Sequence, residues 1–130
     1  MQKHIHERIK TTAEKIAESS GATAVVEIEN KTLVTYNDPA LTRKLLPSLI
    51  KAAGKENVLE MNAVTGAEDF SFFAEKIPSL YLYVGGLPSG KDPREAAAHH
   101  TPDFYVDDAG MKTGILAFLM MVTDYMDMQK

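Results

Sequence analysis

The sequence has 130 residues, 45% of them hydrophobic and 25% charged, which is the length and composition of one soluble globular domain. The formal net charge of -4, with scattered lysines and arginines, excludes a basic surface for nucleic acid or for an anionic membrane. Without cysteine there is no disulfide or thiolate site, and no apolar run approaches the ~20 residues that span a bilayer, so we expect a soluble, cytoplasmic protein.

A helix and a strand are predicted at the start of the chain. Apolar residues recur at intervals of three and four from Ile5 to Ala17, and Gly21 stands where a helix would end. This pattern predicts an amphipathic helix over residues 3–19. The following stretch, "ATAVVEIEN", alternates in its second half and is rich in β-branched residues, which predicts a strand over residues 22–29.

The next element is a second helix. Asn37 or Asp38 can cap it, with Pro39 at its first position and a stripe of leucine and isoleucine side chains that continues up to Gly54. Pro47 lies inside that stripe and therefore predicts a kink or an early break.

Two further strands and two further helices are predicted in the remaining sequence. "NVLEM" is a short apolar strand candidate, and "TGAEDFSFFAEKIP" predicts a turn and a short helix that ends at Pro78. "SLYLYVGG" is apolar on both faces, which is typical of a central strand. A long polar loop over residues 85–107 then leads to an apolar helix over residues 109–128.

This order of elements predicts an α/β fold, a layered mixed sheet with flanking helices. Three strand candidates make a narrow sheet, and the first helix and strand lack matching strands. We therefore expect either a segment upstream that completes the fold or self-association, because unpaired edges and apolar surface favour association.

The stretch "EAAAHHTPDFYVDD" places His99 and His100 in an irregular loop after the predicted central strand. Such a position favours a functional site, and a metal centre would need three or four ligands in all. The alternative is that both imidazoles are ordinary solvent-facing side chains. Asp107 and Asp108 stand at a helix start, where capping is favoured over catalysis.

A second candidate is the stretch "TGAEDFSFF". Asp69 is expected to cap the helix that follows, and Phe70, Phe72 and Phe73 are expected in the core. Glu68 lies on the loop just before the cap and follows the flexible Gly66. Its carboxylate could face a cleft, orient a metal-bound histidine, or hold the loop through backbone amides.

Three segments together, "VTYNDPALT", "TGAEDFSFFAEKIPSLYLYVGG" and "AHHTPDFYVDDAGMKTG", resemble the C-terminal third of the metal-dependent amidohydrolases of the aminoacylase and carboxypeptidase family. The branch includes hippurate hydrolase, thermostable carboxypeptidase and auxin-conjugate hydrolases. The resemblance implies that residues 1–36 are the last helix and strand of a lid domain, which often mediates dimerisation. It implies that residues 37–130 are the closing part of a zinc-peptidase catalytic domain.

In that family the histidine directly before Ser/Thr-Pro is a metal ligand, which implies this role for His100. The "G-x-E-D-F" loop lies by the substrate cleft in the family, and it matches Gly66, Glu68 and Asp69 here. The other ligands and the catalytic glutamate belong to the N-terminal two thirds of such enzymes. The resemblance therefore implies a divalent metal, zinc or else manganese or cobalt, in the complete enzyme, with none bound tightly by this chain.

Two functions follow as hypotheses. The first is that the chain is the C-terminal part of an amidohydrolase or carboxypeptidase that cleaves the amide bond of N-acyl amino acids or small peptides. In this hypothesis the chain is inactive alone, and an upstream chain that carries the other metal ligands completes the enzyme. The second is a non-catalytic structural module that self-associates as a homo-oligomer. Neither hypothesis involves nucleic acid or a membrane as a partner.

Overall fold

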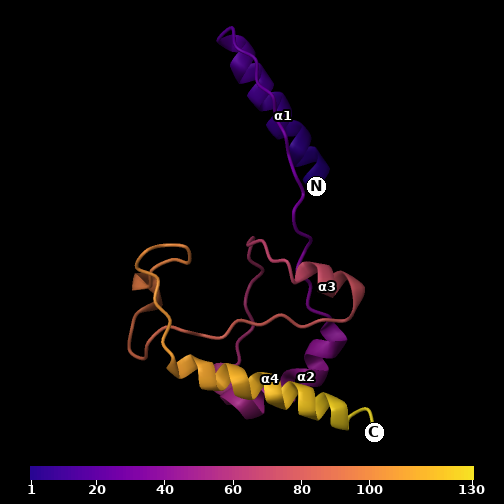
Figure 1. The fold of residues 1–130 in the computed structure, drawn as a ribbon, viewed down its shortest axis with the longest axis vertical. Helices are drawn as coiled ribbons and strands as arrows, with labels where there is room; N and C mark the ends of the chain where they lie inside the picture. The colour runs from indigo at the N-terminus through magenta and orange to yellow at the C-terminus, as the bar shows by residue number, and fades with distance from the viewer. The chain divides into compact units, whose positions relative to one another are not determined.

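The computed structural model describes residues 1–130, which divide into two compact units, Met1–Lys31 and Thr32–Lys130 (Figure 1). The predicted boundary between a lid, residues 1–36, and a catalytic part, residues 37–130, rests on the family resemblance and stays a prediction.

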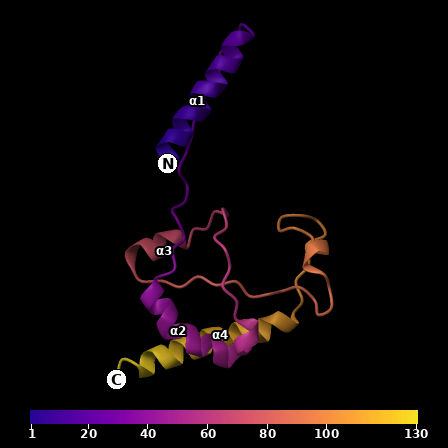
Figure 2. The ribbon, with the colours of Figure 1, turned by 180° about the vertical axis from the view of Figure 1, so that it is seen from behind.

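The first unit is one helix and the segment that follows it. Helix α1 (Gln2–Ser19) confirms the predicted helix, and it ends where Gly21 adopts a φ of 69°. The amide of Ala22 donates to the carbonyl of Ala17, a closing bond that needs this left-handed glycine. The chain then runs back along the helix (Figures 1 and 2). The Gln2 side-chain amide donates to Asn30 at 2.8 Å.

The second unit contains three α-helices and two short 3-10 helices. In chain order they are α2 (Pro39–Ala53), η1 (Lys55–Asn57), α3 (Ser71–Lys76), η2 (Pro93–Glu95) and α4 (Ala109–Asp127). The predicted helices before Gly54, before Pro78 and over 109–128 are confirmed in kind and place. None of the helices in the chain combines the length and the apolar character that crossing a membrane requires.

Helix α2 begins as the sequence predicts. The Asp38 carboxylate accepts a hydrogen bond from the amide of Leu41 at 2.7 Å, and Pro39 occupies the first turn. The early break predicted at Pro47 is wrong, because the helix continues unbroken to Ala53. Pro47 is exposed, so the carbonyl one turn earlier that loses its amide partner lies on the solvent side of the helix.

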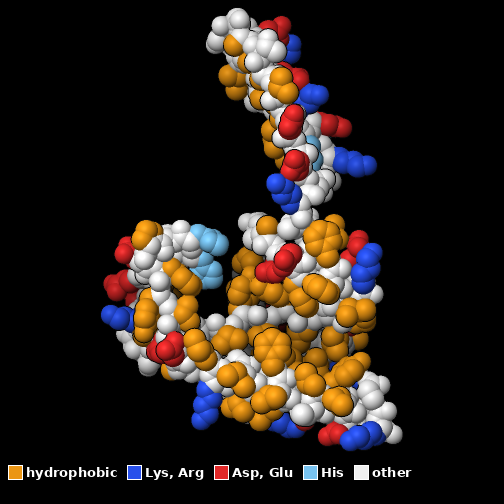
Figure 3. Space-filling model, in the orientation of Figure 1, with side chains coloured by type: hydrophobic (Ala, Val, Ile, Leu, Met, Phe, Trp, Pro, Cys, Tyr) orange, Lys and Arg blue, Asp and Glu red, His pale blue; other side chains and the backbone are white.

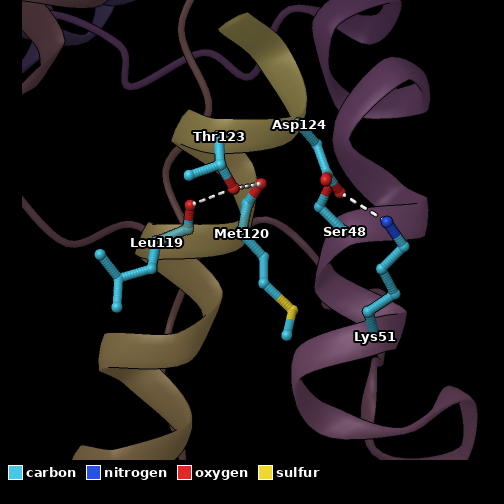
Figure 4. A network of polar contacts seen from close by, with 6 residues as sticks. All are labelled: Ser48, Lys51, Leu119, Met120, Thr123 and Asp124. Carbon is cyan, nitrogen blue, oxygen red and sulfur yellow. Dashed lines mark hydrogen bonds and ion pairs between the residues drawn. The ribbon is translucent and has the colours of Figure 1, made fainter. Parts of the chain in front are cut away.

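Helices α2 and α4 pack together and carry the largest set of contacts between elements. The hydroxyl of Ser48, which is fully buried, donates to Asp124 at 2.6 Å, and the Lys51 ammonium lies 3.0 Å from the same carboxylate oxygen (Figure 4). Lys44 lies 4.6 Å above the centre of the Tyr125 ring. Together, the Ser48 hydroxyl bond and Lys51 lower the pKa of Asp124 below its ordinary value.

The apolar core is small. Only three hydrophobic side chains are buried, Leu45, Ala117 and Met121, at 7%, 5% and 8% exposure. All three lie in the α2–α4 pair. Phe72 and Phe73, which were expected in the core, are 47% and 64% exposed, so that expectation is wrong. Most of the large apolar side chains in the chain therefore face outward.

The predicted layered mixed α/β sheet is wrong, because the structure contains helices and no strands. Residues 22–29, 58–61 and 79–86 are irregular or extended, without a backbone ladder to one another, and Asn57, the first residue of the predicted strand over 57–61, belongs to η1. The reason is physical: alternation and β-branched residues favour an extended backbone, whereas a strand also requires a neighbouring strand whose amides and carbonyls match it. The chain supplies the first condition and not the second.

Residues 79–81 show what takes the place of a neighbouring strand. The amide of Asp38 donates to the carbonyl of Ser79 at 2.9 Å. The side chain of Asn37 accepts from the amide of Tyr81 at 2.7 Å and donates to its carbonyl at 2.8 Å. Asn37, which the sequence offered as a helix cap, thus holds an extended segment instead.

Candidate functional site

The histidine loop, residues 87–106, is closed at its base by one backbone hydrogen bond. The amide of Asp107 donates to the carbonyl of Gly86 at 2.7 Å. The backbone is close-packed here: a Cβ added to Gly86 would lie 2.8 Å from the Val106 side chain, and one added to Gly110 would lie 2.5 Å from the carbonyl oxygen of Gly85. The two ends of the loop are therefore held together at the start of α4.

The interior of the histidine loop is organised by local bonds. Asp92 accepts from the backbone amide of Arg94 at 2.9 Å and pairs with its guanidinium at 2.6 Å. This ion pair lowers the pKa of Asp92. Further along, the hydroxyl of Thr101 donates to the carbonyl of Ala98 at 2.7 Å, which closes the turn that contains both histidines.

His99 and His100 lie side by side at the exposed surface of this turn, as the pale blue side chains in Figure 3 show. Their ring centres are 6.4 Å apart. His99 packs edge-on against Phe104, at 4.7 Å between ring centres. His100 is the one residue other than glycine with a positive φ, 64°, a backbone conformation that few side chains adopt without cost.

This backbone outlier falls on the residue that the sequence singled out. His100 directly precedes Thr101 and Pro102, and the proline restricts Thr101 to extended conformations. The left-handed turn therefore fixes the direction in which the His100 imidazole leaves the backbone. Backbone strain of this kind is a reason to suspect function, and it complements the motif.

The loop with Gly66, Glu68 and Asp69 is held by Glu68. One carboxylate oxygen accepts from the amide of Phe70 at 3.1 Å, and the other accepts from the hydroxyl of Tyr81 at 2.9 Å. These two bonds lower the pKa of Glu68, and the carboxylate in turn raises the pKa of Tyr81. Of the three roles considered for Glu68, the structure displays the one in which it holds the loop through a backbone amide.

Capping at α3 and α4 differs from expectation at Asp69 and at Asp108. The expected cap by Asp69 is wrong, because α3 has no side-chain cap. At α4, Asp107 accepts from the amide of Ala109 at 2.9 Å, whereas Asp108, the residue at the N-cap, makes no side-chain cap bond. Asp69 and Gly66 are exposed, and their place beside a substrate cleft stays a prediction.

Sequence reasoning missed two groups. It assigned Tyr81 to a strand and gave no sign that the Tyr81 hydroxyl would bond Glu68 across 13 residues of chain. It also missed the Ser48–Asp124 pair, which joins residues 76 positions apart. Both depend on tertiary placement, and no local pattern signals them.

The chain does not assemble a metal centre by itself. No group of three or more histidine, aspartate or glutamate side chains is placed to hold a metal ion. His99 and His100 are neighbours on an exposed turn, and two imidazoles fall short of the three or four protein ligands that a zinc site uses. His100 as a ligand therefore stays a prediction for a larger assembly.

Comparison with known proteins assigns the family. The family described as Peptidase family M20/M25/M40 matches residues 3–124, nearly the whole chain. The chain belongs to this peptidase family. The family resemblance noted from the three sequence segments is thereby confirmed, and the family is generally metal-dependent.

Several curated relatives of this peptidase-family chain are hydrolases by name. It is 31% identical over 106 residues to thermostable carboxypeptidase 2 of Saccharolobus solfataricus, covering 81% of this chain and 26% of that protein. It is 33% identical over 92 residues to IAA-amino acid hydrolase ILR1-like 4 of Arabidopsis thaliana, covering 71% of this chain and 20% of the relative.

A third relative is the uncharacterized hydrolase y4tI of Sinorhizobium fredii, 30% identical over 104 residues, with 80% of this chain and 25% of that protein covered. The chain thus spans about a quarter of the length of the curated relatives that it matches. No solved structure matches it.

Proposed function

We propose that this chain is the C-terminal part of a metal-dependent amidohydrolase that hydrolyses the amide bond of N-acyl amino acids or small peptides. The observation that carries the proposal is the family match over residues 3–124, together with relatives named as a carboxypeptidase and an IAA-amino acid hydrolase. His100 would supply one imidazole to a metal whose other ligands lie upstream. We assign no catalytic step to this chain, because its own side chains do not form the metal centre.

The test of this proposal compares the chain alone with a chimaera. In the chimaera, the 130-residue chain replaces the matching segment of the Saccharolobus carboxypeptidase. We expect the chain alone to bind no stoichiometric zinc and to release no amino acid from N-acyl amino acids, and we expect the chimaera to do both. Elemental analysis and an amino acid release assay measure this. Turnover by the chain alone, or a folded chimaera without activity, would contradict the proposal.

We also propose, as a second candidate, that the chain self-associates through α1. Its apolar side is hollowed and uncovered within the first unit, and Ile5, Ile9 and Ile16 are 46%, 49% and 65% exposed. The residues that line this hollow are His4, Ile5, Arg8, Ile9, Thr12, Ala13 and Ile16. A helix with such a stripe is stabilised by a second apolar surface, and another copy of α1 offers one.

Replacement of one isoleucine tests the self-association. We expect Ile9→Glu to shift the chain from oligomer to monomer, because a charged side chain at the centre of the stripe would lose its hydration in the contact. Thr11→Glu, on the opposite side of the same helix, adds the same charge and is expected to leave the oligomer intact. Light scattering over a concentration series gives the mass of each variant. A monomeric parent chain would end this candidate.

A further inference from the structure

Helix α4 is apolar on the side that faces away from α2. We define the outer face of α4 by six side chains: Met111, Ile115, Phe118, Leu119, Val122 and Met126. They recur at intervals of three and four residues, so they share one side of the helix. Each of the six is between 55% and 62% exposed. Figure 3 shows hydrophobic side chains gathered over this helix.

The opposite side of α4 already has its partners. Ala117 and Met121 are buried, and Asp124 bonds Ser48 of α2. Gly114 lies against Val84, where an added Cβ would lie 3.4 Å from the valine side chain. The outer face is therefore an apolar surface separate from the side of α4 that packs against α2.

The chemistry of α4 is that of an interior helix. Residues 113–123 contain no charged side chain. A surface helix carries polar residues opposite its buried stripe, whereas a helix that is apolar on both sides is buried in a larger protein. The contrast with α1 is clear, since that helix carries the ion pairs Lys10–Glu14 and Lys15–Glu18 on its surface.

We propose that the outer face of α4 is the docking surface for the remaining part of the hydrolase. That part corresponds to the three quarters of the relatives' length that this chain does not match. The inference rests on the proposed function and names the surface by which this chain joins the rest of the enzyme. The relatives are about four times longer than the segment that they share with this chain. Their additional length can provide the several packed elements that covering this face requires.

A second copy of the chain is a poorer occupant for this face. The six side chains extend over about 22 Å of helix with a width of about 10 Å. A stable interface buries about 800 Å² on each partner, so a stripe of this size is one part of such an interface, and the greater length of the relatives can supply the other parts. The outer face is thus suited to lie within the continuous apolar interior of a larger protein.

Thiol reactivity tests the inference, because the chain contains no cysteine. Val122→Cys places a thiol on the outer face, and Asp127→Cys places a matched thiol on the charged end of α4. Both are alkylated with iodoacetamide, and mass spectrometry of the peptides reports the rate at each position. The two variants are compared in the 130-residue chain and in the carboxypeptidase chimaera, whose own cysteines are changed to serine.

In the chain alone we expect the two thiols to react at rates within about twofold of each other, since both positions are exposed. In the chimaera we expect Val122→Cys to react at least about tenfold more slowly than Asp127→Cys. Equal rates in a folded chimaera would overturn the inference. Protection of Val122→Cys that grows with concentration in the chain alone would also overturn it, because a second copy would then be the occupant.

The hydrolysis assay separates this inference from the proposed function. If the chimaera is active and the thiol of Val122→Cys reacts readily, the proposed function stands and the docking surface is rejected. If the chimaera is inactive and this thiol is protected, the docking surface stands and the proposed function is rejected. If the chimaera does not unfold cooperatively, the same comparison is made with the Arabidopsis relative as the host. Two hosts that both fail to fold around the chain would count against the docking surface.

Discussion

Replacing His100 is expected to lower the activity of the carboxypeptidase chimaera by at least about a hundredfold, because displacement of a reacting group by about 1 Å already costs that much. His100→Ala removes the imidazole that the family motif assigns to the metal. His100→Asn also removes the imidazole, and asparagine tolerates the positive φ of 64° at this position. Equal losses for both variants would attribute the effect to the imidazole and not to the backbone.

His99 is the matched control for this prediction. His99→Ala removes the contact with Phe104, an aromatic pair that contributes about 0.5–1.5 kcal/mol, so the loss of activity is expected to stay below about tenfold. The measurement is kcat/KM on an N-acyl amino acid, with zinc content determined for each variant. A larger loss for His99→Ala than for His100→Ala would show that the ligand has been assigned to the wrong residue.

The second large effect is expected at Gly110. Gly110→Ala should lower the free energy of unfolding by about 1–3 kcal/mol, the usual cost of overpacking a close contact. Its Cβ would lie 2.5 Å from the carbonyl oxygen of Gly85, so the start of α4 must move away from the base of the histidine loop. Backbone atoms cannot yield as a flexible side chain can. Urea unfolding of the 130-residue chain measures the change.

Gly114→Ala in the same helix provides the contrasting case. The added Cβ would make an ordinary contact with Val84 at 3.4 Å, and alanine is up to about 1 kcal/mol more favourable than glycine inside a helix. This variant is therefore expected to be as stable as the parent chain or more stable. Equal effects of the two alanines would mean that the close approach at Gly85 does not hold α4 in place.

Helices could be predicted from this sequence because their signals are local. The Asp38 cap followed by Pro39, and the glycine at position 21, each determine a helix end through bonds within a few residues. The strands could not be predicted in the same way. "SLYLYV" has the composition of a central strand, yet a β-ladder needs backbone hydrogen bonds from a neighbouring strand. Here the Asn37 side chain instead bonds the amide and the carbonyl of Tyr81.

The candidate site was predictable in part for a related reason. The motif around His100 identified the residue, and its left-handed backbone is a structural property that no composition or periodicity reveals. The Glu68–Tyr81 bond lay beyond prediction because it joins two segments whose relative placement depends on the packing of α3. Recognition of the family added what neither periodicity nor geometry contains, namely the prediction that further metal ligands belong to a longer chain.

The bond between Asp107 and Gly86 makes the histidine loop a replaceable unit. Since both ends meet at one point, insertions or deletions between them need not disturb α4, and doubling the length of a loop costs only about 0.6 kcal/mol in closure entropy. Evolution can therefore vary the residues around His100 almost independently of the scaffold. The surface segment that carries His99 and His100 can thus change in sequence and length while the helices beneath it remain the same.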